Sequence, residues 1–407
     1  MKKKTKRRKI DREARKLFDC GKLLFNAGHA ITGLGVIGEE RNCLIITLAA
    51  ITRAFQSPVS VLVKGAPSTG KSTLIKRCLE LHPPEARIER ASLSEKALVH
   101  TRESLAHRIL YLSEYRGGKD SRLLMRLLQS EGAITHEYTT IKGTQRCTEV
   151  AATAGSPVIF STTTETKVFE DDETRFLSIW VDETPAQTLA IVKAQVEPRQ
   201  IANAPNLSRW HAVFSALLPS KADFSTPPKW LGYVAEQLPL QLVRVRRDWD
   251  RFLTLLRAVA LTRRCPGERT TINIEFQDYC VARKILEPAM AATMHGVRGQ
   301  ELEIVHAVHA LSSHSREVTA RDIAEHLGWK VAVTYKHTKA AVRHGLLKYA
   351  HGARQQNKKP VIATGKNRGF LPKPSFVLRH NPDIGASIQF VDPFSGKKKV
   401  IRAKSIT

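Results

Sequence analysis

The chain has 407 residues, enough for two or three domains with at least one large core. Its hydrophobic content of 42% and charged content of 25% are typical of a soluble globular protein. No run approaches 18 apolar residues, and the basic N-terminus has no apolar segment behind it. These features argue against a membrane span and a secretory signal, so we expect a cytoplasmic protein. Six scattered cysteines without a C-x-x-C pair argue against a zinc finger and a disulfide scaffold.

The net charge of +27 is unevenly distributed. Residues 1–9 carry seven Lys or Arg and no acid, and residues 330–407 carry 17 Lys or Arg against only Asp383 and Asp392. Such local surpluses are costly to keep compact unless a polyanion neutralises them, and nucleic acid is the usual one. An anionic membrane surface is the alternative, but no amphipathic basic helix with bulky apolar anchors accompanies the charge.

The first part of the chain is predicted to be a basic disordered arm, residues 1–10, followed by a helical segment, residues 11–57. The spacing of apolar residues indicates helices at 11–27 and 39–55, although Gly21 weakens the first. From 58 to 185, short apolar runs alternate with helices, which is typical of a parallel α/β sheet. Strands are predicted at 59–63, 87–91, 109–112, 158–161 and 179–181, and helices at 71–81 and 95–99.

A glycine-rich segment follows the first strand and opens a helix. It reads Gly65-Ala66-Pro67-Ser68-Thr69-Gly70-Lys71-Ser72, continues with Thr73, and matches the P-loop pattern in the context that the pattern requires. Gly65 and Gly70 let backbone N–H groups curve round phosphates without a Cβ in the way. Lys71 is expected to reach the β- and γ-phosphates of ATP, and Ser72 to bind Mg²⁺. The sequence therefore predicts a nucleoside-triphosphatase.

A second part of the site is expected at the end of the strand 109–112. This apolar run delivers Ser113 and Glu114 to the C-terminal edge of the sheet, where ligands bind. Glu114 is the candidate general base for the attacking water and a candidate Mg²⁺ ligand. Ser113 stands where an acidic residue is usual, and its hydroxyl is expected to hold a magnesium-bound water without adding charge. The alternative is an exposed glutamate that simply follows a core strand.

The strand 158–161 ends in four consecutive hydroxyl residues, 161–164. Hydroxyls at the end of a strand pack poorly but suit a γ-phosphate or its water. Thr162 or Thr163 is therefore the candidate sensor-1 residue, and an ordinary capped turn is the alternative.

Two arginines are candidates for stabilising transition-state charge. Arg175 lies between an acidic loop and an apolar strand, from which it can project toward a neighbouring subunit's γ-phosphate. A salt bridge with Glu173 or Asp172 is the alternative. Arg247 precedes the clearest helix, 249–263, and is the candidate lid (sensor 2) arginine, although a solvated helix start has the same pattern.

Helices dominate from 186 to 298, the predicted lid and linker. Residues 299–380 are predicted to form a winged-helix domain, with helices at 301–311, at 320–327 and ending near 344, and strands at 346–349 and 374–378. A basic tail, 381–407, follows. The third helix is expected to expose Lys330, Thr334, Lys336, His337, Lys339 and Arg343. Of these, Lys336, Lys339 and Arg343 are the candidate duplex-DNA contacts, with protein docking or lid regulation as the alternative.

The order of these parts resembles the AAA+ ATPases, and within them the helicases similar to the minichromosome-maintenance (MCM) proteins, including compact versions carried by phages, plasmids and genomic islands. The segment 175–182 is similar to the arginine-finger segment of that group. Segments 38–42, 94–98, 130–132 and 184–188 are similar to motifs of helicase or primase-associated ATPases on mobile elements. The resemblance covers residues 30–350. It implies an AAA+ core at 58–185, ATP with Mg²⁺, and a homo-oligomer, a hexamer by analogy.

Members of that superfamily place a β-hairpin ahead of sensor 1, with a basic tip in a central DNA channel. Residues 133–141 and 144–150 fit such a hairpin, and Lys142 and Arg146 are the residues implied to contact single-stranded DNA. An ordinary surface hairpin is the alternative. Arg116 and Lys119, just after the strand 109–112, occupy the place of a second channel loop. Only about 55 residues precede the ATPase, and the sequence has no zinc site and no primase signature, unlike cellular MCM proteins.

The resemblance and the charge favour a ring-forming, ATP-dependent DNA translocase or helicase in replication of a mobile element or phage, in a bacterial or phage-infected cell, with a primase or other replication proteins as partners. The alternative is a DNA-binding AAA+ switch that recruits a partner in initiation or transposition without unwinding. A small-molecule kinase would explain Lys71 and Ser72 but not the winged helix or the charge.

Overall fold

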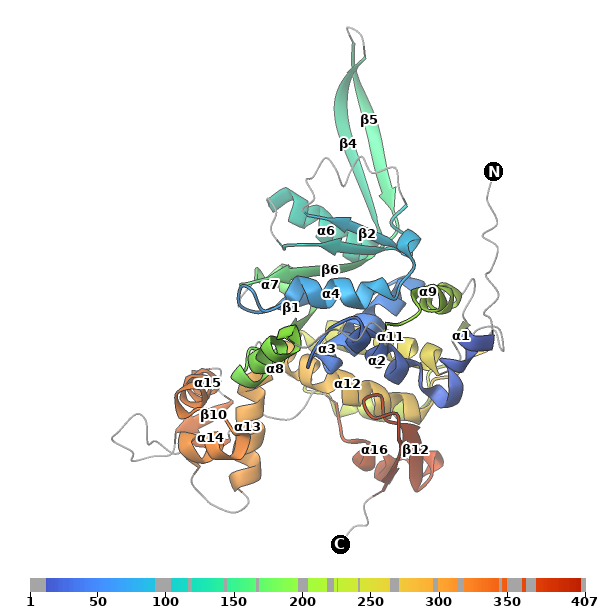
Figure 1. Ribbon diagram of the computed structural model, residues 1–407. Helices are drawn as coiled ribbons and strands as arrows, with labels where there is room; N and C mark the ends of the chain where they lie inside the picture. Colours follow the sequence, from blue (N-terminus) through green and yellow to red (C-terminus); the bar gives the residue numbers. More distant parts are fainter. Residues whose placement is uncertain are drawn as a thin grey trace. The chain divides into compact units, whose positions relative to one another are not determined.

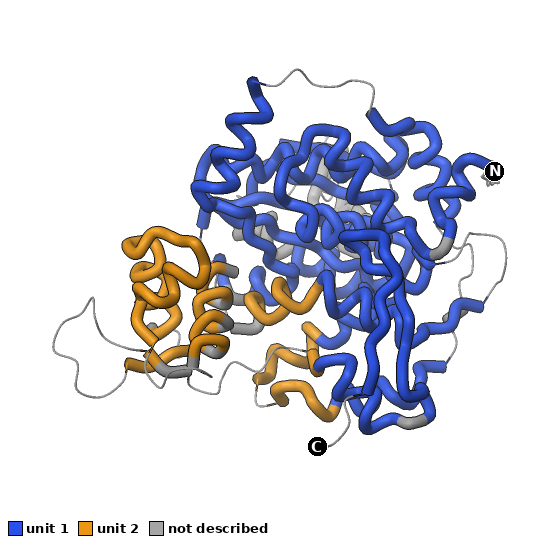
Figure 2. The backbone as a smooth tube through the Cα atoms, turned by 60° about the horizontal axis from the view of Figure 1, so that its bottom comes forward, with its two compact units in different colours: residues 1–235, 249–285, 373–407 blue, residues 236–248, 286–372 orange. Residues whose placement is uncertain are grey.

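The computed structural model describes residues 12–91, 104–115, 119–142, 145–165, 168–196, 204–217, 223–224, 226–240, 242–263, 271–295, 299–312, 318–343, 346–349, 361–363 and 371–403. The chain divides into two compact units (Figure 2). Unit 1 comprises residues 1–235, 249–285 and 373–407, and unit 2 comprises residues 236–248 and 286–372. Among the described residues, no helix is long and apolar enough to cross a membrane.

The centre of unit 1 is a five-stranded parallel sheet (Figure 1). Its order is β2 (Arg87–Arg90), β3 (Ile109–Leu112), β6 (Val158–Thr163), β1 (Ser60–Lys64), β7 (Phe176–Trp180). The residues of β1, β3 and β6 are all buried, as expected of inner strands covered on both faces. The predicted parallel α/β sheet is therefore confirmed.

Strand order brings three chain segments together at one edge. Because β6 lies between β1 and β3, its end at Thr163 pairs with Lys64, and Ser161 pairs with Leu112. The segments that follow β1, β3 and β6 therefore emerge side by side at the C-terminal edge. In a parallel sheet this is the edge where ligands bind.

Helices on both sides of the sheet supply the rest of the core. The N-terminal helices are α1 (Arg12–Lys16), α2 (Leu23–Gly33) and α3 (Glu40–Ile51). Gly21 adopts a φ of +72°, so the predicted helix 11–27 is broken there into α1 and α2. α3 is buried from Cys43 to Ile51, and α4 (Lys71–Glu80) follows β1. The short helix expected at 95–99 lies outside the described residues.

A long β-hairpin is inserted in the chain between β3 and β6, which are themselves paired in the sheet. It follows α6 (Lys119–Glu131) and consists of β4 (Ala133–Lys142) and β5 (Gln145–Ala154), paired antiparallel along their whole length. Figure 1 shows the hairpin as a two-stranded ribbon that extends away from the parallel sheet. The predicted hairpin is confirmed, and it is longer than expected on its second strand.

The remaining part of unit 1 is mainly helical. Its elements, some shared with unit 2, are α7 (Glu170–Glu173), α8 (Pro185–Val196), α9 (Leu207–Ala216), α10 (Trp230–Glu236), α11 (Val245–Thr262), α12 (Phe276–His295) and the parallel pair β8 (Asp223–Phe224) and β9 (Thr271–Ile272). The clear helix expected at 249–263 is thus part of α11.

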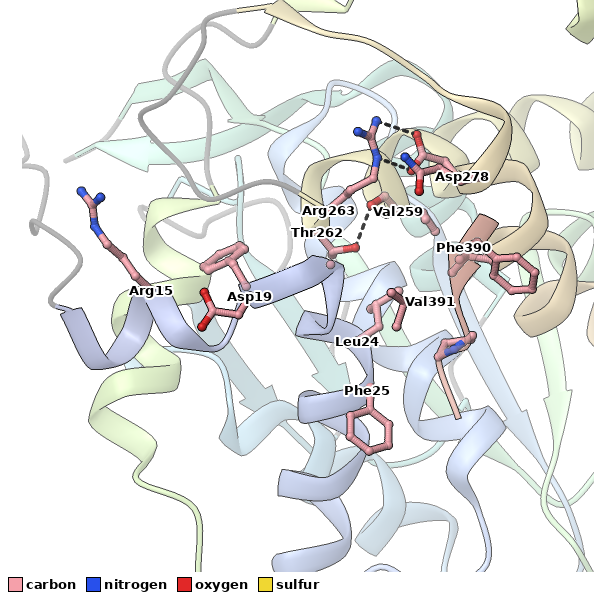
Figure 3. Close-up of a pocket in the computed structure, with 15 residues that line it drawn as sticks. Arg15, Asp19, Leu24, Phe25, Val259, Thr262, Arg263, Asp278, Phe390 and Val391 are labelled. Atoms are coloured by element: carbon pink, nitrogen blue, oxygen red, sulfur yellow. Dashed lines mark hydrogen bonds and ion pairs between the residues drawn. The ribbon is translucent and has the colours of Figure 1, made fainter. Parts of the chain in front are cut away.

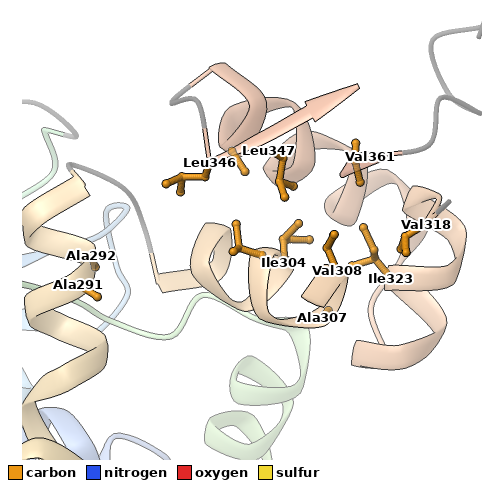
Figure 4. Close-up of a cluster of buried hydrophobic side chains, with 12 residues drawn as sticks. Ala291, Ala292, Ile304, Ala307, Val308, Val318, Ile323, Leu346, Leu347 and Val361 are labelled. Carbon is orange, nitrogen blue, oxygen red and sulfur yellow. The ribbon is translucent and has the colours of Figure 1, made fainter. Parts of the chain in front are cut away.

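Besides parts of α11 and α12, the described residues of unit 2 form three complete helices and a short antiparallel pair: α13 (Gly299–Ser312), α14 (Ala320–Leu327), α15 (Val331–Arg343), β10 (Leu347–Tyr349) and β11 (Val361–Ala363). A capping box between Thr319 and Asp322 begins α14, and Gly328 ends it in a left-handed conformation. Ile304, Ile323 and Val361 are among the buried side chains that join these elements (Figure 4).

One expectation about the C-terminal region is wrong. The segment predicted as a strand at 374–378 is the helix α16 (Pro374–His380), because Pro374 suits the first turn of a helix and Val377 and Leu378 share its buried face. The partner of β10 is β11 instead. Residues 373–407 belong to unit 1, and the predicted basic tail contains a hairpin of β12 (Ser387–Val391) and β13 (Lys398–Arg402).

Candidate nucleotide site

The glycine-rich loop after β1 has the geometry of a phosphate cradle. Gly65 has no room for a side chain, because a Cβ there would overlap Val181 and lie 3.0 Å from Thr69 Oγ1. Gly70 has open space around it but a φ of +82°, so glycine is needed there for its backbone conformation. Ser68 also has a positive φ, +63°. The two glycines therefore serve different purposes, one close packing and the other curvature of the loop.

Lys71 begins α4 and lies over this loop. Its ammonium donates to the carbonyl oxygens of Gly65 at 2.9 Å and Ala66 at 2.5 Å, and the residue is 8% exposed. Burial lowers the pKa of Lys71, while the negative charges of Glu183 and Glu114 oppose this shift. Ser72 and Thr73 follow in the exposed first turn of α4. A cation and a helix N-terminus thus face the loop, as binding of a polyphosphate requires.

Glu183 is a residue of this site that the sequence did not reveal. It follows β7, and its Oε1 accepts a hydrogen bond of 2.6 Å from the backbone N–H of Ala66. The carboxylate therefore fixes the first turn of the cradle and adds negative charge near Lys71. The sequence does show that Glu183, like Glu114, is an acidic residue just after a strand. It does not show that β7 is the neighbour of β1, and only this pairing brings Glu183 to the glycine-rich loop.

Ser113 and Glu114 leave β3 at the same edge. Glu114 is exposed, and its charge acts on Lys71, so the predicted acid and the cradle are brought together. The backbone carbonyl of Ser113 accepts a hydrogen bond of 2.6 Å from the hydroxyl of Thr162. Tyr115 N–H in turn donates to the carbonyl of Thr162 at 2.8 Å. The segment that carries Glu114 is therefore held on both sides by the end of β6.

The two threonine candidates have different surroundings. The hydroxyl of Thr162 donates a hydrogen bond to the backbone carbonyl of Ser113. Thr163 Oγ1 instead accepts a hydrogen bond of 3.1 Å from the N–H of Glu165, as in a short hydroxyl-capped turn. Both residues are 5% exposed. Thr163 also accepts, through its carbonyl, from Gly65 N–H at 3.3 Å. Both lie at the cradle's edge, and their sensor role stays a prediction.

The segments 38–42 and 184–188 meet next to the cradle. Glu39 Oε1 accepts from the N–H of Asp182 at 2.7 Å, and Asn42 donates to Glu39 at 2.6 Å and to the carbonyl of Trp180 at 2.8 Å. Burial raises the pKa of Glu39 to about 7, although these hydrogen bonds oppose the shift. A Cβ on Gly38, whose φ is +68°, would overlap Gln187. These contacts tie α3 and α8 to the end of β7.

Arg175 lies at the opposite edge of the sheet. Phe176 pairs with Ser60 at the start of β1, whereas the cradle follows its end, so five strand residues, about 16 Å, separate the two levels. Arg175 donates to Ser130 Oγ at 3.2 Å and to the carbonyl of Asp171 at 2.6 Å. Of its suggested ion-pair partners, Glu173 pairs with buried Lys64, and Asp172 lies 3.3 Å from Arg126.

Arg247, the candidate lid arginine, belongs to the other compact unit. It is exposed on α11 within unit 2, whereas the cradle belongs to unit 1. The neighbouring Arg244 forms an ion pair of 2.8 Å with Asp248. The lid role of Arg247 stays a prediction.

The candidate DNA contacts within the described residues lie on the hairpin, on α6 and on α15. In the hairpin, Lys142 pairs with Gln145 and Ile141 with Arg146, so both basic residues are next to the tip. Lys119 begins α6, and Arg116 lies outside the described residues.

Lys336 and Lys339 are exposed on α15, and Lys330, just before the helix, is also exposed. Arg343 is the last residue of α15. Thr334 and His337, expected to be exposed, are buried at 0% and 6%. The helical period places them on the same face as Ala341, in the core of unit 2.

A cavity of about 580 Å³ lies in another part of unit 1 (Figure 3). It is bordered by the N-terminal helices, α11, α12 and β12, and Arg263 within it is paired with Asp278 at 2.7 Å and 3.0 Å. Its lining comes from segments other than the cradle, so its size does not make it the nucleotide site.

The parallel sheet, the glycine-rich loop and the lysine at the helix start define a P-loop nucleoside-triphosphatase domain. The residues fit Mg²⁺ as such domains hold it, because Ser72 offers an exposed hydroxyl in the first turn of α4 and Glu114 an exposed carboxylate nearby. Among the described residues no cluster of three His, Cys, Asp or Glu could hold a metal alone.

Comparison with known proteins agrees with this class. A family model described as the MTBMA_p00010 P-loop domain matches residues 31–207, so the predicted P-loop domain is confirmed. Among solved structures, the chain is similar to a full-length MCM homolog from Methanopyrus kandleri, with 13% sequence identity and a TM-score of 0.47. That alignment covers 69% of this chain and 61% of the homolog, so the chain spans less than two thirds of it. No curated protein matches the sequence.

Proposed function

We propose that the protein is a ring-forming AAA+ ATPase that uses ATP hydrolysis to translocate along or unwind DNA, in replication of a mobile element or phage. One observation carries this proposal: Arg175 and the cradle lie at opposite ends of the same sheet. An arginine so placed reaches a γ-phosphate only if that phosphate belongs to a neighbouring copy. The complete site then needs at least two subunits.

The residues at the C-terminal edge support hydrolysis. Lys71 and the backbone N–H groups of the loop bind the β- and γ-phosphates, and Ser72 holds Mg²⁺, which neutralises phosphate charge when bound. Glu114 orients the attacking water and accepts its proton. Thr162 keeps Glu114 in register through Ser113. Arg175 of the next subunit stabilises the charge that develops on the transferred phosphoryl group.

The hairpin and unit 2 supply the DNA contacts. Lys142 and Arg146 near the hairpin tip contact the backbone of a single strand, in a way that tolerates sequence and weakens with salt. Unit 2, with its three helices and short strand pair, acts as a winged helix that presents Lys336 and Lys339 of α15 to duplex DNA. Residues 330–372, which belong to unit 2, carry ten Lys or Arg and no Asp or Glu, and this surplus supports the role.

A DNA-binding ATPase switch without unwinding is the second candidate. Ser113 favours it, because a hydroxyl in place of a carboxylate binds Mg²⁺ more weakly and suits slow turnover. A strand-displacement assay on a forked duplex, run beside ATP turnover and sedimentation on the same sample, separates the two. Assembly with ATP-dependent unwinding supports the helicase, assembly with turnover alone supports the switch, and a monomer whose turnover ignores DNA contradicts both.

A further inference from the structure

A side-chain hydrogen bond connects Arg175 to the base of the hairpin. Its Nε donates to Ser130 Oγ at 3.2 Å, and Ser130 stands in the last turn of α6, two residues before Gly132. β4 begins at Ala133, directly after that glycine. The arginine at the sheet's opposite edge therefore holds the helix from which the hairpin starts.

The hairpin base is built as a pivot on two glycines. Gly132 and Gly155 have φ values of +70° and +102°, and Gly155 N–H donates to the carbonyl of Gly132 at 2.8 Å. A Cβ on Gly155 would overlap the backbone of Ala106, so the returning strand passes against the loop before β3 without a side chain. Both strands thus enter the hairpin through conformations that other residues rarely adopt.

Space for movement lies beside this pivot. A cavity of about 410 Å³ is bordered by Ser130, Gly132, Gly155 and Ser156 on the hairpin side. Gln56 and His107, from the loops before β1 and β3, border it on the other side. The base therefore has unfilled space on one side, while Gly155 packs against Ala106.

We propose that Ser130 is a positioning residue that couples Arg175 to the hairpin β4–β5. When Arg175 extends toward the nucleotide of a neighbouring subunit, it leaves Ser130 and Asp171, the end of α6 is released, and the hairpin turns about Gly132 and Gly155. ATP in one subunit thereby sets the position of the DNA-contacting hairpin in the next. This inference rests on the proposed function, in which Arg175 acts between subunits and the hairpin contacts DNA.

The test compares single substitutions in the full-length protein. Ser130→Ala removes the bond to Arg175, Ser130→Thr keeps a hydroxyl, and Ser156→Ala removes a different hydroxyl from the same cavity. The readout is the ratio of ATP turnover with single-stranded DNA to turnover without it. Removal of one hydrogen bond to a charged group corresponds to about tenfold, so we expect Ser130→Ala to lower this ratio by about that factor. The other two variants should resemble wild type.

Hydrogen exchange at residues 131–133 and 154–156 provides a second readout that does not depend on DNA. A non-hydrolysable ATP analogue should change exchange there in the assembled wild type and leave Ser130→Ala unaffected. Should Ser130→Ala fold poorly, Gly132→Ala keeps the contact with Arg175 but strains the pivot, and we expect the same loss of DNA stimulation.

The outcomes separate the coupling from the function on which it rests. If DNA stimulates ATP turnover equally in the wild type and in Ser130→Ala, the proposed coupling through Ser130 is overturned and the proposed function stands. No stimulation of the wild type contradicts the function, and exchange at the hairpin base then decides the coupling alone. Equal exchange in both proteins overturns it.

Discussion

The hydroxyl of Thr162 donates a hydrogen bond of 2.6 Å to the backbone carbonyl of Ser113, which joins the end of β6 to the segment that carries Glu114. A side chain at one strand end therefore determines where the neighbouring strand presents its carboxylate. The bond is almost fully buried on the threonine side, since Thr162 is 5% exposed. The proposed catalytic position of Glu114 and the spacing of the two strand ends thus depend on the same contact.

Replacing Thr162 by valine keeps the shape of the side chain and removes this bond. We expect the turnover number for ATP to fall about tenfold, because one positioning hydrogen bond is removed, while ATP binding changes little. Thr164→Val, at an exposed neighbouring position, is the matched control. Steady-state turnover and nucleotide titration measure the two quantities, and a weaker affinity with an unchanged turnover number would contradict the positioning role.

Lys71→Ala should abolish nucleotide turnover. The ammonium lies over the loop, and its removal takes away the charge that binds the β- and γ-phosphates, so we expect a loss of about 100-fold or more. Lys76→Ala, on the exposed face of the same helix, should behave like wild type. Full activity of Lys71→Ala would remove the phosphate-cradle assignment.

Arg175→Ala should retain ATP binding and lose hydrolysis by about 1,000-fold, the usual effect of an arginine that stabilises the phosphoryl transition state. Mixing it with Lys71→Ala offers a direct test of action between subunits. Each variant is inactive alone, but Lys71→Ala supplies an intact Arg175 to a neighbour whose cradle is intact. Activity should therefore return in part in the mixture, and its absence would show that Arg175 acts within its own subunit or only in folding.

The sheet and its functional edge could be predicted from the sequence because strand ends and the P-loop pattern are local. The strand 109–112 was predicted with the bounds that β3 has, and it delivers Glu114 to the cradle. Glu183 was not found, because its contact with Ala66 depends on β7 being the neighbour of β1, and the order of strands is not encoded in any local pattern.

Two other residues show why polarity alone misassigns a helix face. Thr334 and His337 are polar and were expected on the surface of α15, yet both are buried. Thr334 satisfies its hydroxyl by donating to the carbonyl of Lys330 at 3.2 Å, and the His337 ring lies 6.0 Å from that of Trp329. Internal partners of this kind lower the free-energy cost of burying polar groups, and they become visible only once the helices are packed.

Lys336→Ala combined with Lys339→Ala should weaken binding to duplex DNA without lowering ATP turnover. Both lysines are exposed on α15. Each phosphate contact that is removed should reduce the slope of log affinity against log salt by about 0.9, so the double variant should reduce it by about 1.8. Titration of a labelled duplex at several salt concentrations measures this slope. Lys76→Ala combined with Lys193→Ala, both exposed in unit 1, is the charge-matched control. An unchanged slope would assign unit 2 to protein docking instead.

Glu39 should make stability depend on pH. Burial raises its pKa from 4.5 to about 7 in the folded state, so between these values the folded protein holds a proton that the unfolded chain has released. The contribution of Glu39 to the free energy of unfolding is therefore fully present below pH 4.5 and is lost as the pH rises toward 7. The loss amounts to about 1–3 kcal/mol. Glu39→Gln should flatten this dependence, because a neutral amide still accepts from Asp182 N–H, whereas Glu40→Gln on the exposed side should leave it as in wild type. Denaturant unfolding between about pH 5 and 8 compares the three proteins, and equal slopes would mean that the Glu39 carboxyl is ionised across this range.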